Sequence, residues 1–339
     1  MKTDTNRKKM RKIRFSANLG IAFAAVLWGT SFIMIRWGLA HIDSLLFVFL
    51  RFALATLLFL PFALRITENL GRLLIRKEII AIGLFNAMAF LSQYLGQETT
   101  TAGLTALFVS FYVIFVPLLS PFFLKEKMSA KIVISTIIGL LGAFFVTTNL
   151  DFSGLSGEDI IGNILALVAS IAWTGYILVS KKYLDKDEKL SGIDVFFGSI
   201  TWTSVFLVLG LPFMKTPIIR AYEQTFWQAI VALIYLAVVC TIGAFGIYLY
   251  SLKQVQAGES TIVLLLEIIV AWVLELILHF FMPEIWTVDT RPWTIIGTVM
   301  ILSAVVFVSV NFNDLRKKMR KKNKKAAGNN EISTTIEEI

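Results

Sequence analysis

Ten apolar stretches of about 20 residues, separated by short polar segments, dominate this chain of 339 residues. An apolar run of this length matches the ~30 Å hydrocarbon core of a bilayer when it is helical. The composition agrees, because 57% of the residues are apolar and 16% are charged. In soluble domains, roughly half of the residues are apolar and about a quarter are charged. We therefore predict an all-α integral membrane protein with ten transmembrane helices, at 19–38, 44–64, 79–97, 103–123, 132–149, 160–180, 193–213, 228–250, 259–281 and 293–311.

The 32 Lys and Arg residues are distributed unevenly between the two sides that these helices define. If the N-terminus is cytoplasmic, 27 of them fall in inner segments, at 1–18, 65–78, 124–131, 181–190, 251–258 and 312–339. Only Lys215, Arg220 and Arg291 fall in outer loops. This bias places both termini in the cytoplasm, with the protein in the plasma or inner membrane. The basic segments then contact anionic membrane lipids, and we expect no nucleic-acid partner.

The two ends of the chain differ from the apolar region between them. Residues 1–18 are basic, and we expect the apolar run that follows to be retained as a helix, because no signal-peptide cleavage pattern follows it. Residues 312–339 form a basic and polar tail that we expect to be disordered. One cysteine and two histidines support neither a disulfide framework nor a metal site, so we expect no metal and no cofactor.

Two halves of the chain, 19–149 and 160–311, resemble each other. Short motifs recur in the same order, and their offsets rise steadily through 145, 151, 155 and 158 residues. The matched positions are Trp28 with Trp173, Asp43 with Asp194, Pro61 with Pro212, Gly103 with Gly258 and Gly139 with Gly297. Because each half holds five helices, the second half enters the membrane from the opposite side. Inverted repeats of this kind surround a central site in alternating-access transporters.

Several motifs form a wider pattern, with LWGTSF at 27–32, Arg51-Phe52, YVIFVP at 112–117, KEK at 125–127 and Leu266-Glu267. On these residues the chain resembles the EamA family of the drug/metabolite transporter superfamily, over about 17–311. The resemblance implies two five-helix repeats, export of a small organic metabolite or drug, and a cavity lined by helices 3 and 4. Departures from the family pattern include Ile268 where proline is usual, and the additional Glu275 and His279 in helix 9. These departures affect the expected substrate, not the fold.

Charged residues inside the spans are costly, so each is expected to face a cavity or a partner. At 1.5 Å per residue, Arg51 and Glu275 lie at similar depths, roughly 10 Å and about 9 Å from the outer surface. This match predicts an Arg51–Glu275 pair that acts as structural glue or as an outer gate. The alternative is that Arg51 reaches outward while Glu275 contacts His279. Glu267, nearer the middle, is expected to bind a cationic substrate group or a coupling proton; the alternative is a structural hydrogen bond to a neighbouring helix.

Uncharged residues complete the predicted site. Trp28 and Trp173 are repeat-related and lie mid-span, where they suit an apolar or aromatic substrate or a cation over a ring. Pro117 is expected to be either a hinge or a fixed kink in helix 4. The KEK turn is expected to set topology and to cap a helix. The predicted substrate-binding residues are Trp28, Gln93, Tyr94, Tyr112, Trp173, Tyr176, Tyr248 and Glu267, and for each the alternative is helix packing.

Together these features predict a secondary transporter of a small organic molecule, acting as an exporter, proton-coupled through Glu267 and Glu275, and working by alternating access. The chain lacks a G-x-x-x-x-G-K-[ST] loop, so it has no ATP-hydrolysing motor of its own. The alternatives are a channel or a structural membrane partner and, last, an integral-membrane enzyme. The expected partners are the substrate and membrane lipids, and the protein is expected to be a monomer or a homodimer.

Overall fold

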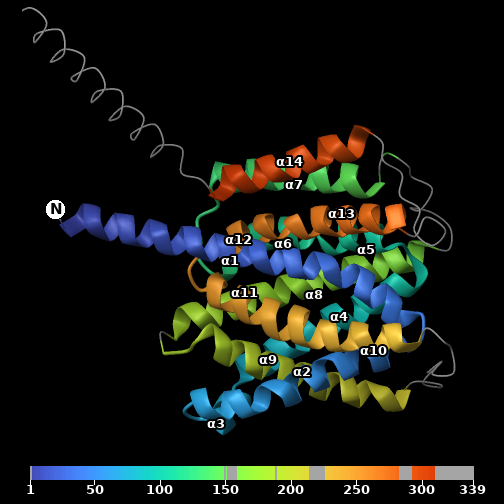
Figure 1. Cartoon of the computed structure of the whole chain (residues 1–339). Helices are drawn as coiled ribbons and strands as arrows, with labels where there is room; N and C mark the ends of the chain where they lie inside the picture. Colours follow the sequence, from blue (N-terminus) through green and yellow to red (C-terminus); the bar gives the residue numbers. More distant parts are fainter. Residues whose placement is uncertain are drawn as a thin grey trace, which may run out of the picture.

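The computed structural model describes residues 2–148, 150, 159–187, 189–213, 226–281 and 292–309, which form helices and connections without a β-strand (Figure 1). Within these described residues, ten helical segments are long and apolar enough to cross a membrane. This confirms the predicted all-α membrane fold; the tail at 312–339 lies outside the described residues. The segments are Lys9–Leu39, Ser44–Ile66, Lys77–Thr99, Gly103–Phe123, Ala130–Thr148, Ile160–Lys186, Gly192–Gly210, Phe226–Leu252, Ala257–Phe281 and Pro292–Ser309.

The first helix, α1 (Lys2–Leu39), begins well before the apolar span predicted at 19. Its basic N-terminal part continues the same helix and extends beyond the rest of the bundle (Figure 1). Apolar residues in this extension, Met10 and Ile13, are exposed. The sequence predicted a basic cytoplasmic N-terminus at 1–18 without assigning it a conformation, and the structure describes residues 2–18 as the first part of α1.

The other helices of the first half are α2 (Ser44–Ile66), the short α3 (Leu70–Leu74), α4 (Lys77–Thr99), α5 (Ala102–Val109), α6 (Tyr112–Phe123) and α7 (Ala130–Thr148). Three of them, α2, α5 and α7, begin with a side-chain cap, which satisfies backbone N–H groups that have no partner within the helix, and for α7 the cap is Ser129 Oγ, which accepts from the Ile132 N–H. Asp43 accepts a hydrogen bond from the Leu45 N–H at the start of α2. Thr101 accepts one from the Leu104 N–H at the start of α5.

The second half contains α8 (Asp159–Lys186), α9 (Gly192–Gly210), η2 (Leu211–Phe213), α10 (Phe226–Tyr235), η3 (Leu236–Gly243), α11 (Ala244–Leu252), α12 (Ala257–Leu264), α13 (Leu266–Phe281) and α14 (Pro292–Ser309). A reciprocal capping box between Ser191 and Asp194 begins α9. The eighth transmembrane helix joins α10, the π-helical η3 and α11 into one continuous segment. π-helical turns inside membrane helices are often found at functional sites.

The fourth and ninth transmembrane helices are each interrupted at equivalent positions. The fourth breaks at Ser110–Phe111, between α5 and α6, and the ninth breaks at Leu265, between α12 and α13. These two breaks are 155 residues apart, which is the predicted offset between Gly103 and Gly258. The helix does not break at Pro117, which lies inside α6 and packs against Gly258 of α12. The interruption of helix 4 therefore lies nearly two turns before the proline.

The two halves interlock, because the first helix of each repeat packs against helices of the other repeat. Helix α1 packs on α10, α11, α12 and α13, and the equivalent α8 packs on α4, α5 and α6. Helices α2 and α9 pack together, as do α7 and α14, which lie side by side at one edge of the bundle (Figure 1). This reciprocal pattern is that of two five-helix repeats related by an approximate two-fold axis.

A close contact between Gly142 of α7 and Gly297 of α14 fixes the repeat register at this edge. An ideal Cβ at Gly142 would lie 2.7 Å from the Gly297 carbonyl oxygen, and one at Gly297 would lie 2.5 Å from the Gly142 carbonyl oxygen. The next contacts are also reciprocal, Gly142 with Met300 and Gly297 with Phe145. The equivalent residues are thus 155 apart. The predicted match of Gly139 with Gly297 is wrong by three residues, because backbone contact, not the shared Thr-Ile-Ile-Gly letters, sets the register.

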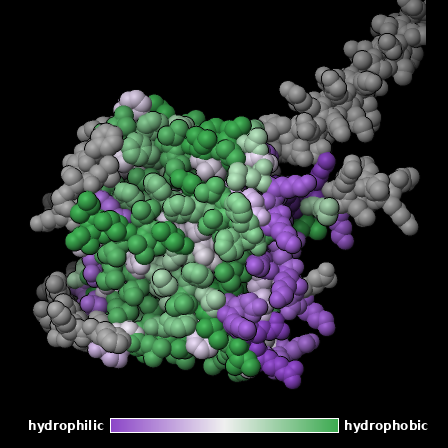
Figure 2. Space-filling model, turned by 180° about the vertical axis from the view of Figure 1, so that it is seen from behind, coloured by the Kyte–Doolittle hydropathy of each residue, from purple (hydrophilic) through white to green (hydrophobic). Residues whose placement is uncertain are grey.

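Polar and apolar residues divide the surface of the bundle. Figure 2 shows a broad hydrophobic band over the helices, with hydrophilic side chains gathered at one end. We call this the basic end; it includes Arg14, Arg65, Arg76, Lys125 and Lys253, and there α1 begins and α14 ends. At this end Arg76 pairs with Asp187 at 3.0 Å, and this contact lowers the pKa of the Asp187 carboxyl. The band matches the solvation that a bilayer core requires.

Candidate functional site

A small cavity lies inside the bundle, between the two repeats. Seven transmembrane helices contribute to its wall, four from the first repeat and three from the second. Most of the wall is aromatic or aliphatic, and two charged residues, Arg51 and Glu267, belong to it. The lining residues are Trp28, Ser31, Phe32, Arg51, Phe90, Gln93, Val109, Tyr112, Trp173, Ile177, Tyr248, Leu264 and Glu267. An apolar cavity with a few converging polar groups is typical of a small-molecule site.

Four aromatic rings, three of them in the cavity wall and Phe245 behind it, repeat the two-fold relationship of the fold. The ring of Trp28 lies 4.7 Å from Phe245, and the equivalent ring of Trp173 lies 5.0 Å from Phe90, both edge to face. Trp28 and Trp173 are 6.5 Å apart, and Phe90 and Phe245 are 5.8 Å apart. Equivalent residues meet each other only at a symmetry axis. The approximate two-fold axis therefore passes through this aromatic cluster.

Tyr112 and Glu267 meet on the same axis. The Tyr112 hydroxyl donates a hydrogen bond of 3.1 Å to Glu267 Oε1, and the two residues are 155 positions apart. Each lies just beyond the break in its transmembrane helix, at the start of α6 and in the first turn of α13. Both side chains are buried. Glu267 therefore faces the cavity and also hydrogen-bonds a neighbouring helix, while its binding of a cationic substrate group or a proton stays a prediction.

Arg51 of α2 is almost fully buried, with 1% of its surface exposed. Its Nε donates to Thr241 Oγ1 at 2.8 Å, and its Nη1 donates to the Tyr94 hydroxyl at 3.0 Å. The guanidinium also lies over the Phe90 ring, 4.6 Å from the centroid. The third nitrogen, Nη2, has no hydrogen-bond partner among the described residues. This arrangement holds a cation at the cavity wall with one donor still available to a ligand.

The predicted pair between Arg51 and Glu275 does not form in this structure. Thr241 and Tyr94 accept hydrogen bonds from two of the three Arg51 nitrogens, and the third has no partner among the described residues. Glu275 does not line the cavity. Similar depth in the membrane was not a sufficient argument, because it leaves the position around each helix undetermined.

Of the other predicted site residues, Trp28, Gln93, Tyr112, Trp173, Tyr248 and Glu267 line the cavity. Tyr94 and Tyr176 lie behind the wall instead. Tyr94 positions Arg51, and Tyr176 packs edge to face on Trp173, with ring centroids 5.4 Å apart. Phe90, Ile177 and Thr241 were missed by the sequence prediction. The 155-residue offset relates Phe90 to Phe245 and would have identified that pair.

Comparison with known proteins identifies the family. The model of the EamA-like transporter family matches residues 15–148 and 160–310. The chain belongs to the EamA-like transporter family. The predicted resemblance is thus confirmed, and the chain is a transporter rather than an enzyme. The two matched segments correspond to the two interlocked halves of the fold.

Individual relatives agree with this membership. An uncharacterized transporter of Archaeoglobus fulgidus is 25% identical over 298 residues, covering 88% of this chain and 87% of that protein. The uncharacterized transporter YdfC of Bacillus subtilis is 25% identical over 320 residues, covering 92% and 95%. A probable amino-acid metabolite efflux pump of Salmonella typhimurium is 25% identical over 233 residues, covering 66% and 73%. One crystal structure aligns with a TM-score of 0.68 at 16% identity, over 86% of this chain and 97% of that one, which supports the fold.

Proposed function

We propose that this protein is a secondary transporter that exports a small organic metabolite, with the substrate bound in the cavity on the two-fold axis. One observation carries the proposal: equivalent residues of the two repeats, Trp28 with Trp173 and Tyr112 with Glu267, meet inside the same cavity. When two inverted repeats exchange their conformations, positions on the axis move least. A site there is presented to each side of the membrane in turn.

The chemistry of the cavity favours a substrate that carries both charges. Arg51 offers an unpaired N–H for an anionic group, Glu267 offers a carboxyl for an ammonium group or a proton, and the rings of Trp28 and Trp173 offer apolar contact. We propose an amino acid or a related metabolite with an apolar side chain. The efflux-pump name of the Salmonella relative is consistent with that class. We assign coupling to Glu267 and not to Glu275, which lies outside the cavity.

We also propose that the basic end lies in the cytoplasm of the cell that makes the protein. Apart from Arg36 and Arg51 inside the spans, the described Lys and Arg residues gather at this end, and α1 begins and α14 ends there (Figure 2). Cytoplasmic loops of membrane proteins carry such an excess of positive charge. In this orientation we place the protein in the cell membrane, with both of its termini in the cytoplasm.

Counterflow in proteoliposomes tests the proposal. Vesicles preloaded with an unlabelled panel of apolar and aromatic amino acids are diluted into trace labelled compound, and uptake is compared with that of vesicles loaded with buffer. A transporter predicts transient accumulation of at least one tracer above equilibrium in preloaded vesicles only. Equal uptake with and without preloading would indicate a channel, and no tracer movement for the whole panel would reject the proposed substrate class.

A further inference from the structure

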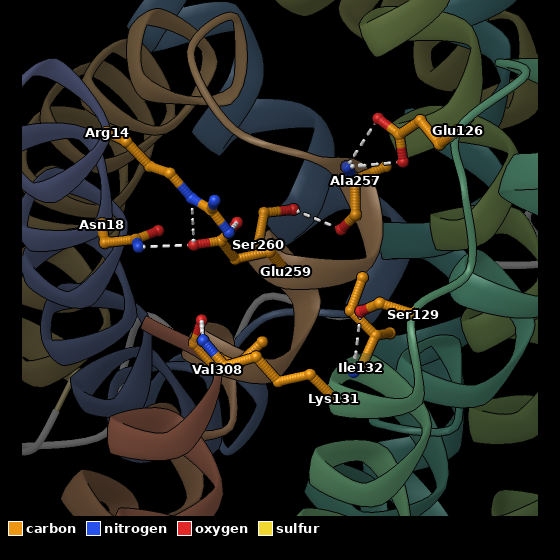
Figure 3. Close-up of polar contacts among 10 residues, drawn as sticks. All are labelled: Arg14, Asn18, Glu126, Ser129, Lys131, Ile132, Ala257, Glu259, Ser260 and Val308. Carbon is orange, nitrogen blue, oxygen red and sulfur yellow. Dashed lines mark hydrogen bonds and ion pairs between the residues drawn. The ribbon is translucent and has the colours of Figure 1, made fainter. Parts of the chain in front are cut away.

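At the basic end, the first turn of α12 is held by a carboxylate from the other repeat. Glu126 lies in the connection between α6 and α7, and both of its oxygens accept the backbone N–H of Ala257 at 3.1 Å (Figure 3). The N-cap residue of α12, Gln256, makes no side-chain cap hydrogen bond. Glu126 therefore caps α12 in place of Gln256. The KEK turn at 125–127 was predicted to cap a helix. The contact joins the two repeats at their cytoplasmic side.

A second carboxylate fastens the same turn to α1. Glu259 lies in the first turn of α12, and its side chain is fully buried. The guanidinium of Arg14 in α1 donates to both carboxylate oxygens of Glu259. Its Nε lies 3.0 Å from Oε1, and its Nη2 is bonded to Oε2. Asn18 Nδ2 donates to Glu259 Oε1 at 2.7 Å. Figure 3 shows Arg14 and Asn18 approaching Glu259 from the same helix.

Among the residues that the structure describes, the positions equivalent to Asn18 and Glu259 have different contacts. The 145-residue offset relates Asn18 to Asn163, and the 155-residue offset relates Glu259 to Leu104. Asn163 accepts a hydrogen bond from the Thr100 hydroxyl at 2.9 Å, and Leu104 is a buried apolar residue. The first turn of α5 therefore has no carboxylate where α12 has Glu259. The carboxylate of Glu259 is thus a difference between the two otherwise equivalent helices α12 and α5.

We propose that Glu126 and Glu259 form the cytoplasmic gate of this transporter, because inward opening must release the first turn of α12 from both α1 and the α6–α7 connection. Helix α12 runs from this turn to the break at Leu265, just before Glu267 at the cavity. A movement of the gate is thus transmitted to the site by one short helix. Both contacts are formed here, and the charged lock biases the protein toward closure on the cytoplasmic side. The inference rests on the proposed transport function.

Accessibility labelling tests the gate without a known substrate. The cavity-lining Ile177→Cys is introduced into Cys240→Ala, which lacks the chain's single cysteine. A membrane-impermeant thiol reagent is then applied to inside-out vesicles. Loss of one hydrogen bond to a charged group is expected to shift the equilibrium between the closed and open gate about tenfold. Glu259→Ala, Arg14→Ala and Glu126→Ala are each expected to raise the labelling rate from the cytoplasmic face by about that factor.

Glu78→Gln is the matched control. Its carboxylate lies at the same end but 4.0 Å from Lys186, with 41% of the side chain exposed, so the labelling rate should not change. If Glu259→Ala does not fold, the half-exposed Arg14 and the surface-proximal Glu126 provide the test. Unchanged labelling in both folded Arg14→Ala and Glu126→Ala overturns the gate. If labelling rises but counterflow fails, the gate stands and the proposed substrate class or transport mode is wrong.

Discussion

The hydroxyl of Tyr112 bonds to the carboxylate of its own repeat-equivalent, Glu267, 155 residues later in the chain. A contact between equivalent residues marks the axis that relates the two repeats. Trp28 with Trp173, Phe90 with Phe245, and Gly142 with Gly297 mark the same axis. The cavity lies on this axis. The two repeats differ in chemistry there, because the phenol of Tyr112 in one repeat faces the carboxylate of Glu267 in the other. The Tyr112–Glu267 pair thus places a carboxylate at the cavity where the other repeat has a phenol.

The glycine pair at the edge of the bundle predicts a stability effect. Gly142→Ala or Gly297→Ala forces a methyl group into the backbone of the partner helix, and α7 and α14 must separate. Overpacking of this kind costs about 1–3 kcal/mol of unfolding free energy. Thermal unfolding of the purified protein in detergent measures the loss. Gly246→Ala in α11, where a Cβ meets nothing within 4 Å, is the control and should be neutral or stabilising.

The hydrogen bonds of Arg51 predict which neighbours hold it. Tyr94→Phe and Thr241→Val each leave one buried guanidinium donor without its acceptor, at a cost of about 1–3 kcal/mol in unfolding free energy. Glu275→Gln should change the stability much less, because Glu275 makes no contact with Arg51 here. The same thermal unfolding assay compares the three variants. A loss in Glu275→Gln as large as that in Tyr94→Phe would restore the ion pair expected from depth alone.

The cytoplasmic gate predicts a pH dependence through Glu126. Burial raises the pKa of this carboxyl, and Asp185 raises it further, against the lowering effects of the Ala257 N–H, Lys181 and Ser120. The closed gate therefore binds the proton more tightly than an open gate in which Glu126 meets water. As the pH falls from the raised pKa of Glu126 in the closed gate toward the ordinary pKa of a carboxyl, protonation increasingly favours the closed state. This stabilisation of the closed state is lost when the pH rises above the raised pKa.

Labelling of the thiol from Ile177→Cys at several pH values measures this effect. Each rate is divided by the rate in Glu126→Gln, which keeps an acceptor oxygen but does not titrate in this range. The ratio should fall as the cytoplasmic side is acidified. A ratio that is constant or rises would show that Glu126 does not link closure to protonation in the direction that burial requires.

The sequence allowed prediction of the ten spans because apolar length alone sets them. It also predicted that Trp28 and Trp173 are equivalent, and both line the cavity. It misplaced the match of helices 5 and 10, because shared letters at Gly139 do not record which glycine touches Gly297. It did not identify the contacts of Arg51 or Glu126, since both join segments of different repeats. Depth can be counted along a helix, but neighbours in the membrane plane depend on how the repeats interlock.

Proton-driven transport with and without Glu267 tests the central claim most directly. Proteoliposomes holding the wild-type protein, Glu267→Gln or Glu275→Gln are given an imposed pH gradient, and accumulation of the tracer found by counterflow is measured. We predict gradient-driven accumulation in the wild type and in Glu275→Gln, and its loss in Glu267→Gln, because only Glu267 lies in the cavity on the axis. Accumulation by Glu267→Gln equal to that of the wild type, with the same pH dependence, would contradict the account.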